Sequence, residues 1–307
     1  MINYENVMLR QNVFFCEELP VMCINWIPFY WESADLGERR FDKAAMFLVG
    51  EFPELKLSGL FQFDLGAPRT MLYENNVANN HRDLTAKSIP NHTAMINGVE
   101  CPMIAIQLHL GPATRLEEVA LYLGFGDGDK DVSDHGAPVL GSIGADSAAG
   151  KCLMIDYPAE RMAFVAKPPA EMKIDYVPLR KTPNGHLLLP VQVAGEERWA
   201  LFDTGSSLFG ILTDEMQWAA LTNNQIIDTL HSQAWGETVP FFGGRARAEF
   251  RLGERPLDIS TIYYDARKEW ASFCQSHDLV GIMGNIPFLG EMIVLDFPND
   301  RFGVVRG

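Results

Sequence analysis

Two aspartates that each follow an apolar run and precede a glycine turn are the residues best suited to chemistry in this chain. Asp64 follows residues 59–63 (GLFQF), and Asp203 follows residues 198–202 (RWALF). Two carboxyl groups about 3 Å apart cannot both ionise cheaply, so they share one proton and serve as general base and general acid. If the fold brings Asp64 and Asp203 together, the pair can activate a water molecule.

The segments around the two aspartates belong to an internal repeat. Gly141 follows Asp64 by 77 positions, and Gly281 follows Asp203 by 78 positions. The other matching segments are 139–144 (VLGSIG) with 279–284 (LVGIMG), and 154–161 (MIDYPAER) with 294–301 (VLDFPNDR). A duplicated unit indicates a fold class more firmly than local propensity does. The repeat predicts two similar halves, each presenting one aspartate at the end of a buried strand.

The boundary between the halves is expected at a pair of consecutive prolines flanked by charges, a composition typical of a stiff connector. The sequence predicts an N-terminal lobe over residues 1–166, a linker over 167–173 and a C-terminal lobe over 174–307. The first lobe carries an extension of about fifty residues that its partner lacks. Within it, the aromatic stretch 26–31 (WIPFYW) could pack against a lobe or extend a sheet.

Alternating apolar residues dominate the rest of the chain, as at residues 103–108 (MIAIQL) and 248–252 (AEFRL). Alternation with a period of two favours strands. The fold class is therefore expected to be all-β, mostly antiparallel, with a few short helices. One helix is expected near residues 213–221 (TDEMQWAAL), with Thr213 as its N-cap.

Residues 201–207 (LFDTGSS) resemble the active-site motif of pepsin-like aspartic peptidases, and the repeated segments resemble the later part of each lobe in that family. The resemblance spans roughly residues 52–304. It implies a two-lobed pepsin-like fold and an aspartic endopeptidase whose catalytic residues are Asp64 and Asp203. In that family the activated water attacks the amide carbonyl directly, so no metal and no cofactor is needed. A peptide or protein substrate would lie in the cleft between the lobes.

Small residues after each aspartate would support the pair. Gly66 and Gly205 allow a sharp turn that brings backbone N–H groups close to the carboxyl oxygens. Ser206 can donate to the outer oxygen of Asp203, whereas Ala67 at the matching position cannot. The two carboxyl groups are therefore expected to differ.

Leu65 is the main departure from the family pattern, which has a threonine or serine whose hydroxyl bonds to the opposite lobe. Thr204 can supply only its own half of that exchange. A buried backbone group left unpaired costs about 1–3 kcal/mol. A weakened pseudopeptidase that binds a peptide or protein partner in the same cleft therefore stays open as an alternative. A third possibility is a cleft filled by the N-terminal fifty residues.

A hairpin that covers the substrate is expected between Asp64 and Gly141. The turn-favouring pair Asn97-Gly98 is the first candidate for its tip, although the flap tyrosine of the family is not evident there. An aromatic-glycine pair, Trp235-Gly236, is the candidate from the second half.

Composition excludes several other classes of function. The chain has 25 Lys+Arg against 40 Asp+Glu, a formal charge of −15 that repels nucleic acid and anionic lipid. No window approaches 18 uninterrupted apolar residues, and the start lacks the features of a signal peptide. Five scattered cysteines suit free thiols in a reducing compartment. A cytoplasmic monomer that neither binds nucleic acid nor enters a membrane is expected.

Metal chemistry has no support in the sequence. The seven histidines show no HExxH pattern or i, i+4 pair. The acidic run at residues 127–131 begins like a calcium loop, but it has Val132 where that loop needs glycine and Pro138 where it needs glutamate. No metal site is predicted.

Overall fold

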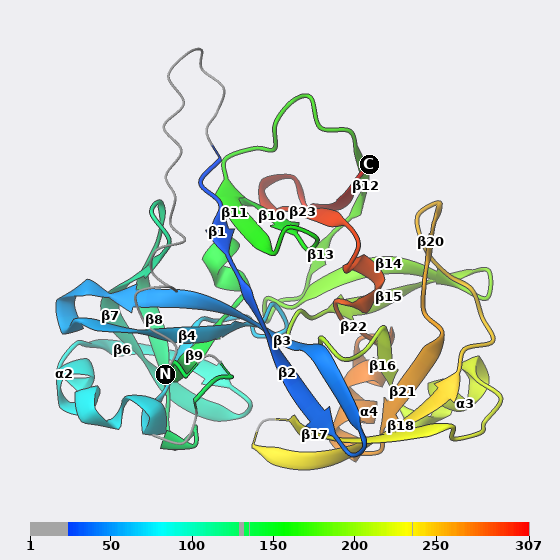
Figure 1. The fold of residues 1–307 in the computed structure, drawn as a ribbon, viewed down its shortest axis with the longest axis horizontal. Helices are drawn as coiled ribbons and strands as arrows, with labels where there is room; N and C mark the ends of the chain where they lie inside the picture. Colours follow the sequence, from blue (N-terminus) through cyan, green and yellow to red (C-terminus); the bar gives the residue numbers. More distant parts are fainter. Residues whose placement is uncertain (1–23, 129–131, 135, 235, 307) are drawn as a thin grey trace.

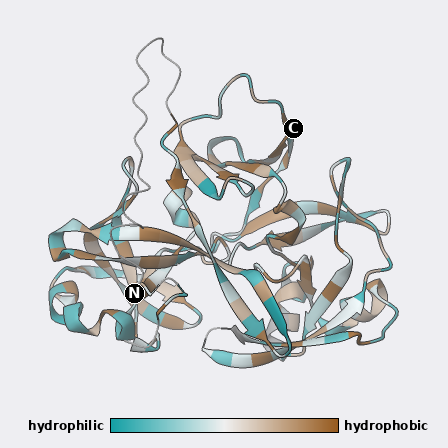
Figure 2. Cartoon of the chain, viewed as in Figure 1, coloured by the Kyte–Doolittle hydropathy of each residue, from teal (hydrophilic) through white to brown (hydrophobic). Residues whose placement is uncertain are grey.

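The computed structural model describes residues 24–128, 132–134, 136–234 and 236–306. These residues form three β-sheets and a few short helices, so the expected mostly-β class is confirmed. One sheet belongs to each half of the chain, and strands from both halves build the third (Figure 1). Hydrophobic residues predominate along the central strands, whereas hydrophilic residues gather on loops and on the helix α2 (Figure 2).

Eight strands form the first-half sheet. They are β2 (Tyr30–Leu36), β3 (Arg39–Phe52), β4 (Leu57–Phe63), β5 (Met71–Tyr73), β6 (Ser88–Ile96), β7 (Val99–Leu110), β8 (Thr114–Tyr122) and β9 (Val139–Ile143). Their spatial order is β2-β3-β4-β9-β5-β8-β7-β6. Because the interior strand β4 ends at Phe63, Asp64 lies directly at its end.

Ten strands form the second-half sheet. They are β13 (Arg180–Lys181), β14 (Leu187–Val193), β15 (Glu196–Phe202), β16 (Ile211–Thr213), β17 (Asp228–Ala234), β18 (Glu237–Arg245), β19 (Phe250–Leu252), β20 (Arg255–Leu257), β21 (Thr261–Asp265) and β22 (Leu279–Met283). Their order is β17-β18-β21-β16-β22-β15-β14-β19-β20, with β13 beside β14. The strand β15 ends at Phe202, so Asp203 occupies the place that Asp64 has in the first half.

The shared sheet brings the two copies of the late repeat together. Its strands, in spatial order, are β1 (Ile27–Pro28), β11 (Arg161–Val165), β10 (Cys152–Asp156), β23 (Met292–Asp296), β24 (Arg301–Val305) and β12 (Ile174–Pro178). β10 and β23 pair antiparallel at its centre, with Met154 opposite Val294. Residues 167–173 lead from β11 to β12 without forming a helix or strand.

The repeat extends to the register of the strands that carry the aspartates. β4 pairs parallel with β9, with Phe63 opposite Ile143, and β15 pairs parallel with β22, with Phe202 opposite Met283. In each half a short strand, β5 or β16, then crosses antiparallel to β9 or β22. The equal spacing in the sequence thus corresponds to equal pairing in space.

The glycines of the repeated strands allow a close crossing of the backbone. A Cβ added to Gly141 would lie 1.9 Å from the carbonyl oxygen of Met71, and one added to Gly281 would lie 2.3 Å from that of Leu212. Real Cβ atoms do not approach so closely, so each crossing requires glycine.

The helices are α2 (His81–Thr85), α3 (Glu215–Leu221) and α4 (Lys268–Ser276). α3 lies where a helix was expected, but the expected cap is wrong. Asp214 is the N-cap and its carboxylate accepts from the N–H of Gln217, while Thr213 ends β16 and donates its hydroxyl to the carbonyl of Val280. No described helix has the length and apolar character needed to cross a membrane.

The aromatic stretch near the N-terminus extends two sheets. Ile27 and Pro28 form β1 at the edge of the shared sheet, and β2 begins at Tyr30 at the edge of the first-half sheet. The ring of Trp31 stacks on Tyr157 with a centroid distance of 6.3 Å. The rest of the expected extension, residues 1–23, lies outside the described residues, as do residues 129–131 of the acidic run.

Candidate active site

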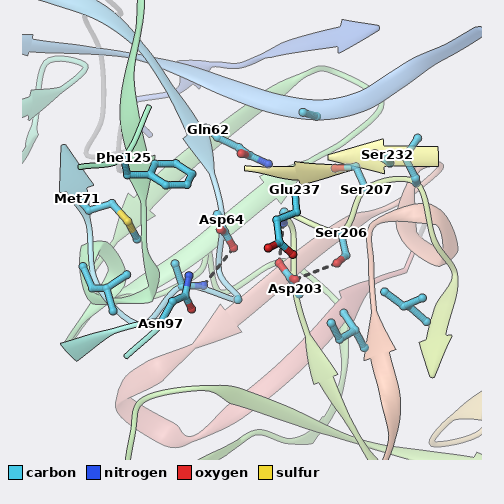
Figure 3. Close-up of a pocket in the computed structure, with 18 of the residues that line it drawn as sticks. Gln62, Asp64, Met71, Asn97, Phe125, Asp203, Ser206, Ser207, Ser232 and Glu237 are labelled. Atoms are coloured by element: carbon cyan, nitrogen blue, oxygen red, sulfur yellow. Dashed lines mark hydrogen bonds between the residues drawn. The ribbon is translucent and has the colours of Figure 1, made fainter. Parts of the chain in front are cut away.

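The ends of β4 and β15 place Asp64 and Asp203 next to each other (Figure 3). The N–H of Asp64 donates to the carbonyl of Ile143, and the N–H of Asp203 donates to that of Met283, each at 3.0 Å. The two aspartates therefore leave equivalent strand pairs in equivalent directions. Oδ1 of Asp64 and Oδ1 of Asp203 lie 2.8 and 3.1 Å from one shared point, the position that a Cβ on Gly205 would occupy.

Each carboxyl group packs against the glycine of the opposite half. A Cβ added to Gly66 would lie 2.4 Å from Cγ of Asp203, and one added to Gly205 would lie 2.8 Å from Cγ of Asp64. Any larger residue at either position would displace the carboxyl group that it faces. The close packing of the pair therefore depends on both glycines, a role beyond the sharp turn that the sequence predicts for them.

Hydrogen bonds to the two carboxyl groups differ between the halves. Asp203 accepts from the N–H of Gly205 at 2.7 Å and from the hydroxyl of Ser206 at 2.9 Å. Asp64 accepts from the N–H of Ala67 at 3.0 Å. Because alanine has no hydroxyl, the first half lacks the counterpart of the Ser206 bond.

The environment of Asp64 favours its protonated form. Burial raises the pKa of Asp64 well above its ordinary value, and the neighbouring Asp203 carboxyl raises that pKa further. Only 8% of Asp64 is exposed to solvent. Asp64 can thus keep its proton at a pH at which an ordinary aspartate has lost it, as the acid member of a water-activating pair must.

Thr204 links the two halves directly beneath the pair. Its hydroxyl accepts from the N–H of Leu65 at 2.9 Å and donates to the carbonyl of Phe63 at 2.8 Å. Leu65 cannot return this exchange, because its side chain is apolar and lies fully buried in the hydrophobic core. The hydrogen bonds from the Thr204 hydroxyl to the first half are therefore present, whereas no matching side-chain bonds run from Leu65 to the second half.

A buried polar chain that the sequence did not indicate supports the loop after Asp203. The hydroxyl of Tyr157 donates to the side-chain carbonyl of Asn285 at 2.7 Å. The amide of Asn285 donates to the carbonyl of Thr204 at 2.9 Å and to the hydroxyl of Ser207 at 2.8 Å. The position of Asn285 directly after the repeated 279–284 segment was the only available sequence clue.

The aspartates line a cleft of about 1870 Å³ to which both halves contribute. Asn97 and Gly98 form the turn between β6 and β7 with φ of 47° and 78°, the left-handed values that a two-residue hairpin turn requires. Both residues line the cleft, so this hairpin lies where the flap was expected.

The second flap candidate lies only partly within the described residues. Trp235 is outside them, whereas Gly236, with φ of 85°, directly precedes β18. Ser232 on β17 and Glu237 on β18 line the cleft, as Figure 3 shows. The aromatic ring seen in the cleft of the first half belongs to Phe125, which stacks on Tyr122 at 4.7 Å.

His186 is a cleft residue that sequence reasoning missed. Its Nδ1–H donates to the carbonyl of Gly66 at 3.1 Å, which places the ring beside the turn that faces Asp203. Burial lowers the pKa of His186, which keeps the ring neutral at neutral pH. His186 lies outside the repeat, so no local pattern distinguished it from the other histidines.

Comparisons with known proteins supply no family for this chain. No protein-family model matches the sequence, and no curated protein matches it. Among the described residues, no group of three or more His, Cys, Asp or Glu side chains is arranged to hold a metal ion.

Proposed function

We propose that the chain is an aspartic endopeptidase of pepsin-like, two-lobed architecture, with Asp64 and Asp203 as its catalytic pair. The observation that carries the proposal is the placement of these two carboxyl groups side by side at equivalent strand ends of a repeated structure. The cleft above them has room for an extended peptide and is lined by a hairpin from each half.

The chemistry follows from the different environments of the carboxyl groups. A water molecule between them transfers a proton to Asp203 while its oxygen attacks the carbonyl carbon of the peptide bond. Asp64 donates its proton to the carbonyl oxygen, which gives a neutral tetrahedral diol. The C–N bond then breaks as Asp203 returns its proton to the leaving nitrogen and Asp64 recovers one from the diol.

Cleavage of a mixed peptide library between pH 3 and pH 8 tests this proposal. We expect the wild type to cut peptides, a statine-containing peptide of the pepstatin type to inhibit it, and Asp203→Asn to abolish turnover. The exposed Asp258, which lies outside the cleft, provides the matched control in Asp258→Asn. Turnover retained in Asp203→Asn would refute the assignment.

A pseudopeptidase is the second candidate, and Leu65 is the observation that favours it. The apolar side chain leaves only one half of the hydroxyl exchange that would hold the pair rigid. Binding of the statine peptide without cleavage of any library member would select this candidate. In that case the same cleft binds a peptide or protein partner.

We further propose that the chain works as a monomer in the cytoplasm. The described cysteines Cys101, Cys152 and Cys274 are buried free thiols, which is compatible with a reducing compartment. Size-exclusion chromatography with light scattering tests the monomeric state, and fractionation of cells tests the location.

A further inference from the structure

The hairpin of β2 and the first part of β3, residues 30–46, projects from the first-half sheet; we call it the arm. β3 pairs with β4 only from Phe47 to Phe52. Residues 39–41 and 45–47 of β3 pair with β2, with an irregularity between these two stretches. A two-residue turn at Gly37, with φ of 67°, closes the tip between Leu36 and Arg39. The arm thus extends beyond the sheet that holds its base.

The tip of the arm lies on the second half of the molecule. The guanidinium of Arg39 pairs with the carboxylate of Asp228 on β17 at 2.5 Å, and Tyr263 on β21 donates to the same carboxylate. Leu36 and Phe41 pack against a second-half apolar cluster (Phe209, Leu212, Leu230, Val239, Phe241 and Tyr263). Figure 1 shows the blue hairpin running from the first-half sheet to the yellow strand β17.

The arm also lines the cleft that contains the catalytic pair. Residues 32–36, Ala44 and Ala45 face the same cavity as Asp64 and Asp203. The arm therefore bridges the two halves along one border of the cleft instead of lying on a distant surface.

The two halves also come close to each other on the side of Phe125. Gly236 faces the Phe125 ring across the cleft, because a Cβ added to Gly236 would lie 3.6 Å from that ring. The β17–β18 hairpin therefore contacts the arm through Asp228 and turns Gly236 toward the first half. The arm and the β17–β18 hairpin thus border the approach to the pair.

We propose that the arm restricts the cleft to short peptides and to chains that can thread in by a free end. Because the two ends of the arm are held by different halves, the arm narrows the space through which an internal loop of a folded protein would have to reach the pair. This inference rests on the proposed peptidase function, because it names the substrate class of the same cleft.

Hydrogen exchange tests the docking of the arm without any ligand. In Leu36→Asp/Phe41→Asp, whose apolar contacts are removed, we expect amides of residues 30–46 to exchange at least about tenfold faster than in the wild type. The matched control is Glu38→Ser at the exposed turn, which should leave exchange unchanged. Arg39→Asp should also speed exchange, and the charge swap Arg39→Asp/Asp228→Arg should restore part of the protection. Equal exchange in the wild type and the double aspartate variant would overturn the proposal.

Association of a blocked peptide tests the restriction itself. The probe is a statine-containing peptide with biotin on a flexible spacer at one end or at both ends, and streptavidin caps each biotin. We expect capping of both ends to slow association with the wild type at least about tenfold relative to capping one end. The Leu36→Asp/Phe41→Asp variant should remove this difference, and Glu38→Ser should keep it.

Hydrogen exchange and probe association together distinguish failure of the arm proposal from failure of the peptidase proposal. Equal association of singly and doubly capped probes with the wild type would refute threading while leaving the peptidase proposal intact. A probe that binds no variant would count against the peptidase proposal, and the exchange comparison would still decide whether the arm is docked.

Discussion

Replacing Thr204 with valine removes the one side chain that joins the loops of both aspartates by hydrogen bonds. Valine has nearly the same shape, so packing is kept while the bonds to the Leu65 N–H and the Phe63 carbonyl are lost. Thr204, Leu65 and Phe63 are all fully buried, so water cannot replace the hydroxyl. Each of the two unpaired buried groups costs about 1–3 kcal/mol, which predicts a loss of roughly 2–6 kcal/mol in the free energy of unfolding.

Thr204→Ser provides the matched control. It keeps the hydroxyl and removes one buried methyl group, which costs about 1 kcal/mol. Urea unfolding followed by circular dichroism measures both variants, and we expect unchanged m-values with a lower midpoint for Thr204→Val. Because the bonds hold the two loops together, peptide cleavage should fall in Thr204→Val and persist in Thr204→Ser. If the valine variant were within about 0.5 kcal/mol of the serine variant, the hydroxyl would not link the halves in the way described.

Two further predictions concern the carboxyl pair. Gly66→Ala places a Cβ 2.4 Å from Cγ of Asp203, so it should abolish cleavage and lower the thermal midpoint. The control Gly290→Ala, whose added Cβ would have no atom within 4 Å, should do neither. An active Gly66→Ala enzyme would contradict the packing. The raised pKa of Asp64 means that the folded state binds its proton more tightly than the unfolded state, so wild-type stability falls as pH rises from about 4 through the folded pKa. Asp64→Asn lacks this proton and should therefore gain stability relative to the wild type between pH 4 and pH 8, as urea midpoints measure; a constant difference would show that Asp64 titrates normally.

The repeat made the similarity of the two halves predictable from sequence, although not the parallel pairing of the strands that carry the aspartates. A parallel strand pair fixes the offset between its members, so the separations of 77 and 78 residues between aspartate and glycine carry over into the same register in both halves. The Asn97-Gly98 turn was predictable because its left-handed backbone is a local requirement.

The arm and the buried polar chain could not be predicted in this way. Arg39 and Asp228 are 189 positions apart, and Tyr157 and Asn285 are 128 apart, with no periodicity that relates either pair. The prediction of the N-cap of α3 failed for a different reason. Thr213 and Asp214 both suit an N-cap, and the choice depends on β16, where the buried Thr213 hydroxyl finds the Val280 carbonyl instead.

The two carboxyl groups have different surroundings because the residues at matching positions after each aspartate differ between the halves. The second half kept hydroxyl groups at Thr204 and Ser206, which donate to the Phe63 carbonyl and to Asp203. The first half has Leu65 and Ala67 at the matching positions, and both are buried among apolar side chains. Fewer donors and greater burial favour the neutral form of a carboxyl group. Leu65 and Ala67, which depart most from the motif that the sequence resembles, therefore flank the carboxyl group whose pKa is raised.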